Sequence, residues 1–221
     1  MNARDQILAS IQRTFAAVPR SSAEDHAAIP RTYIQVGKLD PEARLELFEE
    51  RLRDYGTEVF RCAPAQLPET IGVAMKAAGV SHILAANDIP DGWLPSAPGA
   101  SAQNNGAPSF ARDDDLSYED LDKSEGVLTT CHVAIALTGT IILRHAHDGR
   151  RALTLIPDYH LCIVRASQVV ETVPEAIREI QSPGNSPLTT ISGPSATSDI
   201  EMTRIKGVHG PRKLGVILIL A

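Results

Sequence analysis

A turn rich in small hydroxyl residues is the stretch of this chain best suited to bind a negatively charged group. The apolar, β-branched residues 188–191 lead into a glycine, a proline and several hydroxyl side chains. Glycine permits close backbone approach, proline presets a turn, and Ser or Thr can cap a following helix. A strand-to-helix turn of this kind predicts an anion site, unless the hydroxyls only cap the helix. The candidate ligand-binding residues here are Gly193, Pro194, Ser195, Thr197, Ser198 and Asp199.

A second candidate is the break between two apolar runs at Thr138, Gly139 and Thr140. The glycine lets backbone N–H groups face outward between two hydroxyls, which predicts a neutral cradle for a carboxylate or phosphate. A plain hairpin turn between two strands would have the same sequence, so both interpretations stay open.

Two adjacent arginines, Arg150 and Arg151, follow Gly149 on a loop before a predicted strand at 152–156. A guanidinium binds a carboxylate or phosphate through paired N–H groups, so both residues are candidate ligand-binding residues. The alternative is that they are ordinary surface arginines, whose ion pairs contribute little.

Asp158 and His160 stand two residues apart, which on a strand places them on the same face;. A carboxylate beside an imidazole raises its pKa and orients it for proton transfer, so both are candidate catalytic residues, together with Asp199. The alternative for His160 is a core histidine bonded to a backbone carbonyl. His209, in a turn with Pro211, either completes the pocket of the hydroxyl-rich turn or caps its own turn.

Metal and nucleotide motifs are weak or missing. Three histidines, His145, His147 and His160, are candidate metal ligands. No set of carboxylates and thiolates completes a coordination sphere around them, so we predict no metal;. The three cysteines are scattered without a C-x-x-C pair, so we expect reduced thiols and no cofactor in this chain;. Neither a dinucleotide fingerprint nor a phosphate-loop lysine occurs.

The elements that must position these residues predict an α/β fold with a mostly parallel sheet flanked by helices. Residues 1–35 indicate an N-terminal helix and a linker, and residues 36–221 one α/β domain;. Helices are expected at 40–56, 68–79, 117–121 and 172–180, and strands at 58–62, 80–86, 110–112, 188–191 and 214–220. The first two strands should form a parallel pair. Residues 126–144 and 153–166 should supply neighbouring strands, and 87–108 an ordered loop passing the site.

Composition excludes several classes of partner. The formal net charge is −6, and no basic cluster is longer than Arg150-Arg151, so neither nucleic acid nor an acidic membrane is an expected partner;. No apolar run approaches the ~18 residues of a membrane span, and we expect a cytoplasmic protein. A small anionic metabolite is the better candidate.

Several motifs in order resemble one family. They are TGT (138–140), GRRALTLIPDYH (149–160), VPEAI (173–177), ISGPSATSDIE (191–201) and GVHGPR (207–212). Together they resemble the LUD-domain family, in particular its lactate utilisation protein C group. The resemblance implies a fold similar to ribose-5-phosphate isomerase and the CoA-transferases. One departure is Leu137, where relatives commonly have an acid before the T-G-T break.

The resemblance also implies a role in oxidation of L-lactate to pyruvate, with iron–sulfur clusters carried by partner subunits. We therefore expect a subunit that binds a small anionic ligand. The alternative is a stand-alone enzyme that acts on acyl-CoA or phosphate metabolites, as relatives of that fold do. Fold likeness alone does not decide the chemistry.

Overall fold

The computed structural model describes residues 2–16, 22–95, 108–113, 115–145, 148–181, 186–198, 204–207 and 209–220. The chain divides into two compact units, Met1–Tyr33 and Ile34–Ala221. The first unit holds helices α1 (Ala3–Ala16) and α2 (Ala23–Ala28). Helix α1 confirms the predicted N-terminal helix, and Asn2 Oδ1 accepts the Asp5 N–H at 2.9 Å. Part of the predicted linker forms α2, a short exposed helix that Ser22 and Asp25 cap reciprocally;.

The second unit is built on a parallel sheet of six strands in the order β1-β12-β7-β4-β2-β3. The predicted α/β class is thereby confirmed. The predicted pairing of the first two strands is wrong, because β1 pairs with β12 and β2 lies between β3 and β4. Strand β12 is buried on both faces, as its continuous apolar run predicts;. The strands are β1 (Glu58–Cys62), β2 (His82–Ala85), β3 (Ser109–Arg112), β4 (Gly126–Thr129), β7 (Tyr159–Arg165) and β12 (Lys213–Ile219).

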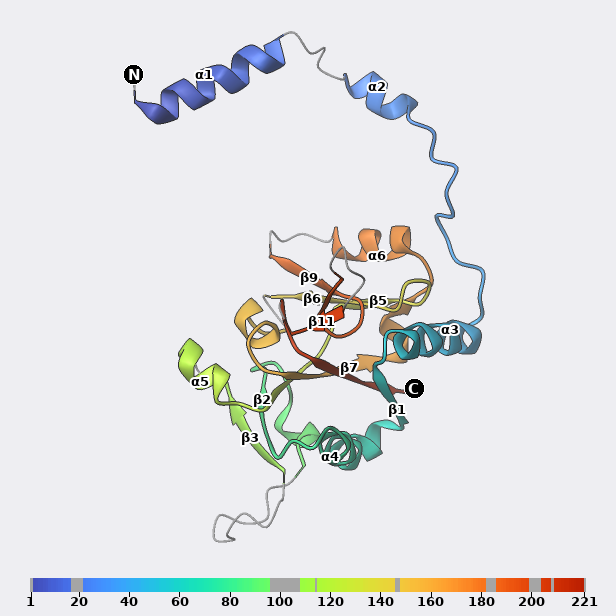
Figure 1. The fold of residues 1–221 in the computed structure, drawn as a ribbon. Coiled ribbons are helices and arrows are strands. Elements are labelled where there is room, and N and C mark those ends of the chain that lie inside the picture. Colours follow the sequence, from blue (N-terminus) through green and yellow to red (C-terminus); the bar gives the residue numbers. More distant parts are fainter. Residues whose placement is uncertain are drawn as a thin grey trace. The chain divides into compact units, whose positions relative to one another are not determined.

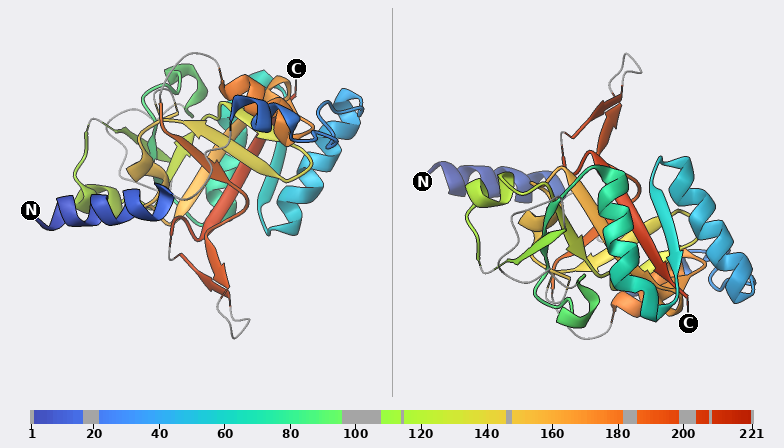
Figure 2. Two further views of the ribbon diagram at one scale, coloured as in Figure 1. Left: turned by 90° about the horizontal axis from the view of Figure 1, so that it is seen from above. Right: turned by 90° about the horizontal axis from the view of Figure 1, so that it is seen from below.

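A second, smaller sheet has four strands in the order β8-β5-β6-β9. The β-branched run at 126–144 therefore divides between two sheets, and only β4 is a neighbour of β7. Strands β10 and β11 pair antiparallel outside both sheets (Figure 2). These strands are β5 (Val133–Ile135), β6 (Thr140–Arg144), β8 (Val169–Val170), β9 (Leu188–Ile191), β10 (Ala196–Ser198) and β11 (Arg204–Lys206).

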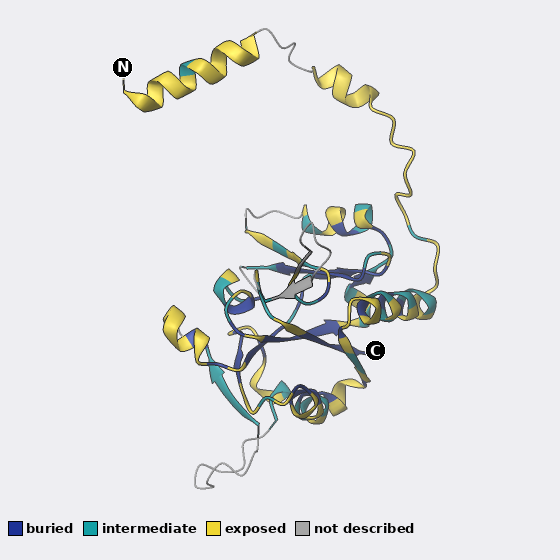
Figure 3. Ribbon diagram, viewed as in Figure 1, coloured by how far each residue is buried: buried dark blue, intermediate teal, exposed yellow. Residues whose placement is uncertain are grey.

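Helices and sheets alternate in layers. Helix α4 lies on one face of the six-stranded sheet, the four-stranded sheet lies over the other, and α6 covers the far side of the smaller sheet (Figure 1). Aliphatic side chains fill the spaces between these layers, and the sheet strands are the most deeply buried elements (Figure 3). The helices of this unit are α3 (Pro41–Asp54), α4 (Leu67–Ala78), α5 (Tyr118–Asp122) and α6 (Val173–Ile180), with 3₁₀ helices η1 (Pro64–Gln66), η2 (Asp91–Trp93), η3 (Arg151–Thr154) and η4 (Ala166–Gln168).

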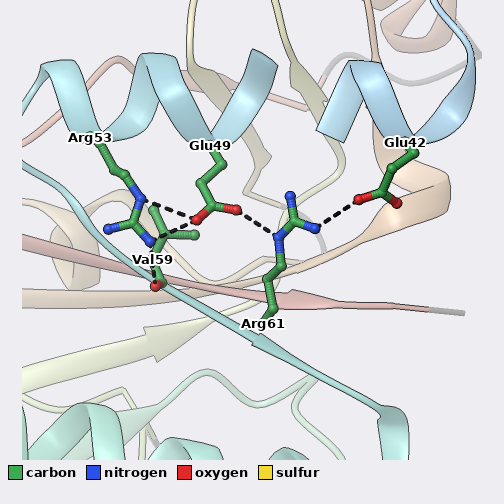
Figure 4. A network of polar contacts seen from close by, with 5 residues as sticks. All are labelled: Glu42, Glu49, Arg53, Val59 and Arg61. Atoms are coloured by element: carbon green, nitrogen blue, oxygen red, sulfur yellow. Dashed lines mark hydrogen bonds and ion pairs between the residues drawn. The ribbon is translucent and has the colours of Figure 1, made fainter. Parts of the chain in front are cut away.

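An ion-pair network fastens α3 to the edge strand β1 (Figure 4). Glu49 accepts hydrogen bonds from Arg53 at 2.6 Å and from Arg61 at 2.6 Å, and Arg61 also reaches Glu42 at 2.8 Å. Burial alone would raise the pKa of Glu49, but the hydrogen bonds from the two guanidinium groups outweigh it and hold that pKa below its usual value;. The network thus links α3 to the sheet. It lies beside the buried face of that helix, which carries Leu45, Phe48 and Leu52.

Two elements near the candidate residues differ from the sequence predictions. Residues 151–154 form the 3₁₀ helix η3, so the strand predicted at 152–156 is wrong. Strand β10 follows the Gly193 turn where a helix was predicted, so the hydroxyls do not cap a helix there. Of the long loop predicted at 87–108, residues 96–107 lie outside the described residues. Within the described ranges, no helix is long and apolar enough to cross a membrane.

Candidate functional site

A cavity of about 270 Å³ opens between the two sheets of the second unit. Its wall combines the end of β9 and the turn behind it, the 3₁₀ helix η3, and the first residues of β7 and β12. Five predicted ligand-binding residues and one candidate catalytic residue meet there. The lining residues are Arg151, Thr154, His160, Thr189, Thr190, Ile191, Ser192, Gly193, Pro194, Ser195, Ala196, His209, Gly210, Pro211 and Leu214.

The turn behind β9 is held by hydrogen bonds of the Ser195 backbone and side chain. The N–H of Ser195 donates to the carbonyl of Pro211 at 2.8 Å, and its hydroxyl oxygen accepts the His209 N–H at 3.1 Å. Gly193 has a φ of +80°, and an added Cβ would lie 2.6 Å from Cβ of Tyr55. The turn therefore needs glycine both for its left-handed backbone and for its close approach to the end of α3.

Arg151 is the permanent cation of the cavity wall. Its Nη1 donates to the carbonyl oxygen of Thr154 at 2.9 Å and to its hydroxyl at 3.1 Å. The Nε and Nη2 groups make no hydrogen bond or ion pair within the part of the chain that the structure describes. This arrangement fixes one side of the guanidinium and leaves N–H donors for an anion.

His160 contributes a buried imidazole to the same wall, with 1% of its surface exposed. Its Nε2 lies 2.8 Å from the hydroxyl oxygen of Thr129, which is fully buried. Burial, with a smaller contribution from the charge of Arg151, lowers the pKa of His160 to about 4;. The imidazole is therefore neutral at pH 7.

Arg150 does not join the cavity. Its Nε and Nη2 each donate to a carboxylate oxygen of Asp113 at 2.7 Å, and Nη2 also donates to the carbonyl of Leu116. The Asp113 carboxylate is buried and the Arg150 side chain is partly exposed, so the pair is a partly buried structural contact. Of the two adjacent arginines, the structure leaves only Arg151 beside the cavity.

Asp158 and His160 also separate. The carboxylate of Asp158 pairs with Arg212 at 2.6 and 2.7 Å and lines a different cavity, of about 540 Å³. Asp158 precedes β7, and no hydrogen bond joins it to the imidazole. The orienting partner expected for His160 is replaced by Thr129.

The Thr138–Thr140 break is the turn of the antiparallel β5–β6 hairpin, the plainer of the two interpretations. Gly139 has a φ of +59° and lies against the backbone of Arg51, where a Cβ would be 3.0 Å from a backbone carbon. Thr138 and Thr140 do not line the cavity. The hydroxyl of Thr140 does contact that of Ser192 at 2.8 Å, so the hairpin supports the cavity wall from behind.

The remaining candidates lie at the limit of the described residues. Thr197 and Ser198 belong to β10, where only the backbone is described, and Asp199 lies outside the described residues. His145 bonds the carbonyl of Gly149 at 2.9 Å and the hydroxyl of Thr189 at 2.6 Å, which occupies both ring nitrogens. His147 is outside the described residues. Across the described ranges, no three His, Cys, Asp or Glu side chains are placed to hold a metal ion.

Sequence reasoning missed Thr129, Thr154 and Ser192. Ser192 stands next to the predicted turn and could have been included with it. Thr129 carries no pattern of its own, because its contact with His160 depends on the pairing of β4 with β7. Thr154 was missed because residues 152–156 were predicted to form a strand, whereas Thr154 belongs to η3.

The fold and this pocket define an α/β domain in which one cation, a neutral imidazole and a pinned hydroxyl-rich turn line a cavity between two sheets. A family model described as LUD domain matches residues 45–219, and the chain belongs to this family. The predicted resemblance to the LUD-domain family is thereby confirmed.

Three relatives support the assignment. "Lactate utilization protein C" of Deinococcus radiodurans is 43% identical over 185 residues, covering 81% of this chain and 82% of that protein. "Lactate utilization protein C" of Bacillus subtilis is 33% identical over 125 residues, covering 52% of each chain. The crystal structure of a DUF162 family protein from Deinococcus radiodurans is 38% identical, with a TM-score of 0.67, and the match covers 82% of this chain and 99% of that one.

Proposed function

We propose that this chain acts as a lactate utilization protein C-type subunit in the oxidation of L-lactate to pyruvate, and that it binds a small carboxylate in the cavity between its sheets. The names of its relatives support the lactate role. The position of Arg151 in the wall of that cavity carries the ligand proposal. Relatives and cavity are independent lines of support.

The described lining favours an anion on electrostatic grounds. It includes the guanidinium of Arg151 and no Asp or Glu. The carboxylate of the ligand would accept from the free Nε and Nη2 groups, which match its two oxygens. The hydroxyl of Ser195 already accepts a backbone N–H and keeps its own proton to donate;.

Electron transfer would take place in partner subunits that carry iron–sulfur clusters. This chain has three cysteines, fewer than the four thiolates that usually hold an iron–sulfur cluster;. Its contribution would be to bind and orient the carboxylate. Co-purification of the tagged full-length chain with two iron–sulfur proteins would support the subunit role, and recovery of the chain alone from lactate-grown cells would contradict it.

The ligand proposal is tested by thermal unfolding of the full-length protein with L-lactate, pyruvate or chloride. A ligand that binds only the folded state raises the melting temperature, and by more at higher concentration. We expect L-lactate or pyruvate to raise it in the wild type, and the rise to disappear in Arg151→Met. The matched control is Arg178→Met, because Arg178 lies on α6, donates to the carbonyl of Gln35 and does not line the cavity. An equal rise in Arg151→Met would remove this cavity from the proposal.

A further inference from the structure

The hydrogen bond between His160 and Thr129 determines what the cavity offers to its ligand. The register pairs Val127 with His160, and Thr129 lies two residues further along β4 on the same face;. Both side chains are buried, and Nε2 and Oγ1 are 2.8 Å apart. The contact is formed inside the protein, where each proton needs an acceptor.

The direction of this hydrogen bond follows from the protons available. Within the described ranges, the Thr129 hydroxyl has no hydrogen-bond partner other than His160. If Nε2 carried the ring proton and donated it, the buried hydroxyl proton would have no acceptor, which costs about 1–3 kcal/mol. If the hydroxyl donates to Nε2, the enclosed hydroxyl proton has its acceptor, and the remaining donor is the N–H of the other ring nitrogen, which is not one of the fully buried polar atoms without a partner and is therefore reached from the cavity. The ring proton of the neutral imidazole is then on Nδ1.

The Nδ1–H group is left without a partner among the described residues. His160 is 1% exposed and lines the cavity, and Nδ1 is not among the fully enclosed polar atoms without a partner, so this donor is reached from the cavity. Because burial lowers the pKa of His160 to about 4, this group stays a neutral donor throughout the neutral pH range. A donor that faces a cavity and has no partner among the described residues is the kind of group that a ligand oxygen can accept from.

We infer that Nδ1–H of His160 donates to a ligand oxygen outside the carboxylate bound by Arg151, so that the site takes hydroxy- or oxo-acids in preference to plain carboxylates. This inference rests on the proposed function and adds to it the residue that would select for the second oxygen of L-lactate or pyruvate. A plain carboxylate offers this donor no second oxygen, and sites built to bond a polar group reject analogues that lack it. His160 is then a specificity-determining residue and Thr129 its positioning residue.

The test compares L-lactate, pyruvate and propionate by calorimetry on the full-length protein at pH 7. Propionate has the carboxylate and carbon chain without the second oxygen. We expect propionate to bind at least about tenfold more weakly than L-lactate or pyruvate, as expected for one lost hydrogen bond. In His160→Phe, the affinities for all three acids should converge on the value for propionate. In Arg151→Met, binding of all three should be lost.

These outcomes separate the inference from the proposed function. If the wild type binds L-lactate and propionate within twofold, or if His160→Phe keeps the preference, the inference is overturned while a carboxylate site remains. If none of the three acids binds, the proposed ligand and the inference both fail.

A spectroscopic measurement covers the case in which His160→Phe does not fold. Side-chain ¹⁵N NMR of the wild type should show His160 with its proton on Nδ1. Thr129→Val should move the proton toward Nε2 and weaken the preference for L-lactate, and Thr129→Ser should restore both. A proton on Nε2 in the wild type would overturn the assignment.

Discussion

Replacing Gly193 by alanine should destabilise the protein through two separable effects. With a φ of +80°, an alanine there carries a left-handed backbone strain of about 1–2 kcal/mol;. Its Cβ would also lie 2.6 Å from Cβ of Tyr55. That atom is attached directly to the backbone at the end of α3, so rotamer changes cannot move it away. Overpacking of this kind costs about 1–3 kcal/mol, and we expect a total loss of about 2–5 kcal/mol.

Gly56 provides the matched control for this experiment. It has a φ of +79°, and its added Cβ would meet nothing within 4 Å. Gly56→Ala therefore reports backbone strain alone, and the unfolded-state effect of a Gly-to-Ala change is common to both variants. Urea unfolding should find Gly193→Ala less stable than Gly56→Ala by about 1–3 kcal/mol. Equal losses in the two variants would refute the contact with α3. Because the turn also lines the cavity, Gly193→Ala alone should weaken the effect of L-lactate on the melting temperature.

Three further outcomes follow from side chains outside the turn. Because the pKa of Glu49 is lowered in the folded protein, its ion pairs stabilise the protein at neutral pH, and this contribution decreases as the pH falls below 4.5 toward the lower folded-state pKa;. Glu49→Gln should therefore cost about 1 kcal/mol in urea unfolding at pH 7 and progressively less as the pH is lowered below 4.5;. Arg150→Met strands the buried carboxylate of Asp113 and should cost about 2 kcal/mol in the same assay, a loss that Asp113→Asn should largely reverse in the double variant;. All three cysteines are buried, and a hydrogen bond with Cys162 together with burial raises the pKa of the Cys131 thiol;. An aromatic disulfide reagent should therefore modify the cysteines only at the rate at which the protein unfolds. Rapid modification of the folded protein would contradict this burial.

The sequence predicted elements whose limits are encoded locally. Asp40 and Pro41 start α3, and Asp40 Oδ1 does accept the N–H of Ala43 at 3.0 Å;. Gly79 ends α4 with a φ of +74°. The strand partners could not be read in the same way, because β1 pairs with β12, from the other end of the chain. Local signals specify where an element ends, whereas pairing depends on the whole topology.

The candidate site was predicted in part for the same reason. Gly193, Pro194 and Ser195 are contiguous, and the structure brings them to the cavity with His209 because the Ser195 turn is bonded to Pro211. The two arginines share a motif, yet only contacts between distant segments distinguish them. Arg150 forms an ion pair with Asp113, which lies 37 positions away in the sequence, whereas Arg151 lies in η3 beside the cavity.

The stand-alone enzyme remains a second hypothesis, and the acyl-transfer version of it has a specific chemical requirement. A CoA-transferase needs a carboxylate nucleophile in reach of its substrate. Three acids in the family-like motifs could fill that role: Asp158 is paired with Arg212 at another cavity, while Asp199 and Glu201 lie outside the described residues. The described lining of the candidate cavity offers no carboxylate.

We therefore expect the purified protein to form no acyl-enzyme. The protein is incubated with acetyl-CoA and separated from it by rapid gel filtration, because hydroxylamine also cleaves the thioester of acetyl-CoA. Hydroxylamine then converts a carboxylate-bound acyl group into a hydroxamate, which is measured against a no-enzyme control. Hydroxamate at one equivalent per chain that disappears in Asp199→Asn would establish the enzyme. It would also make the hydroxyl-rich turn, rather than Arg151, the centre of its chemistry.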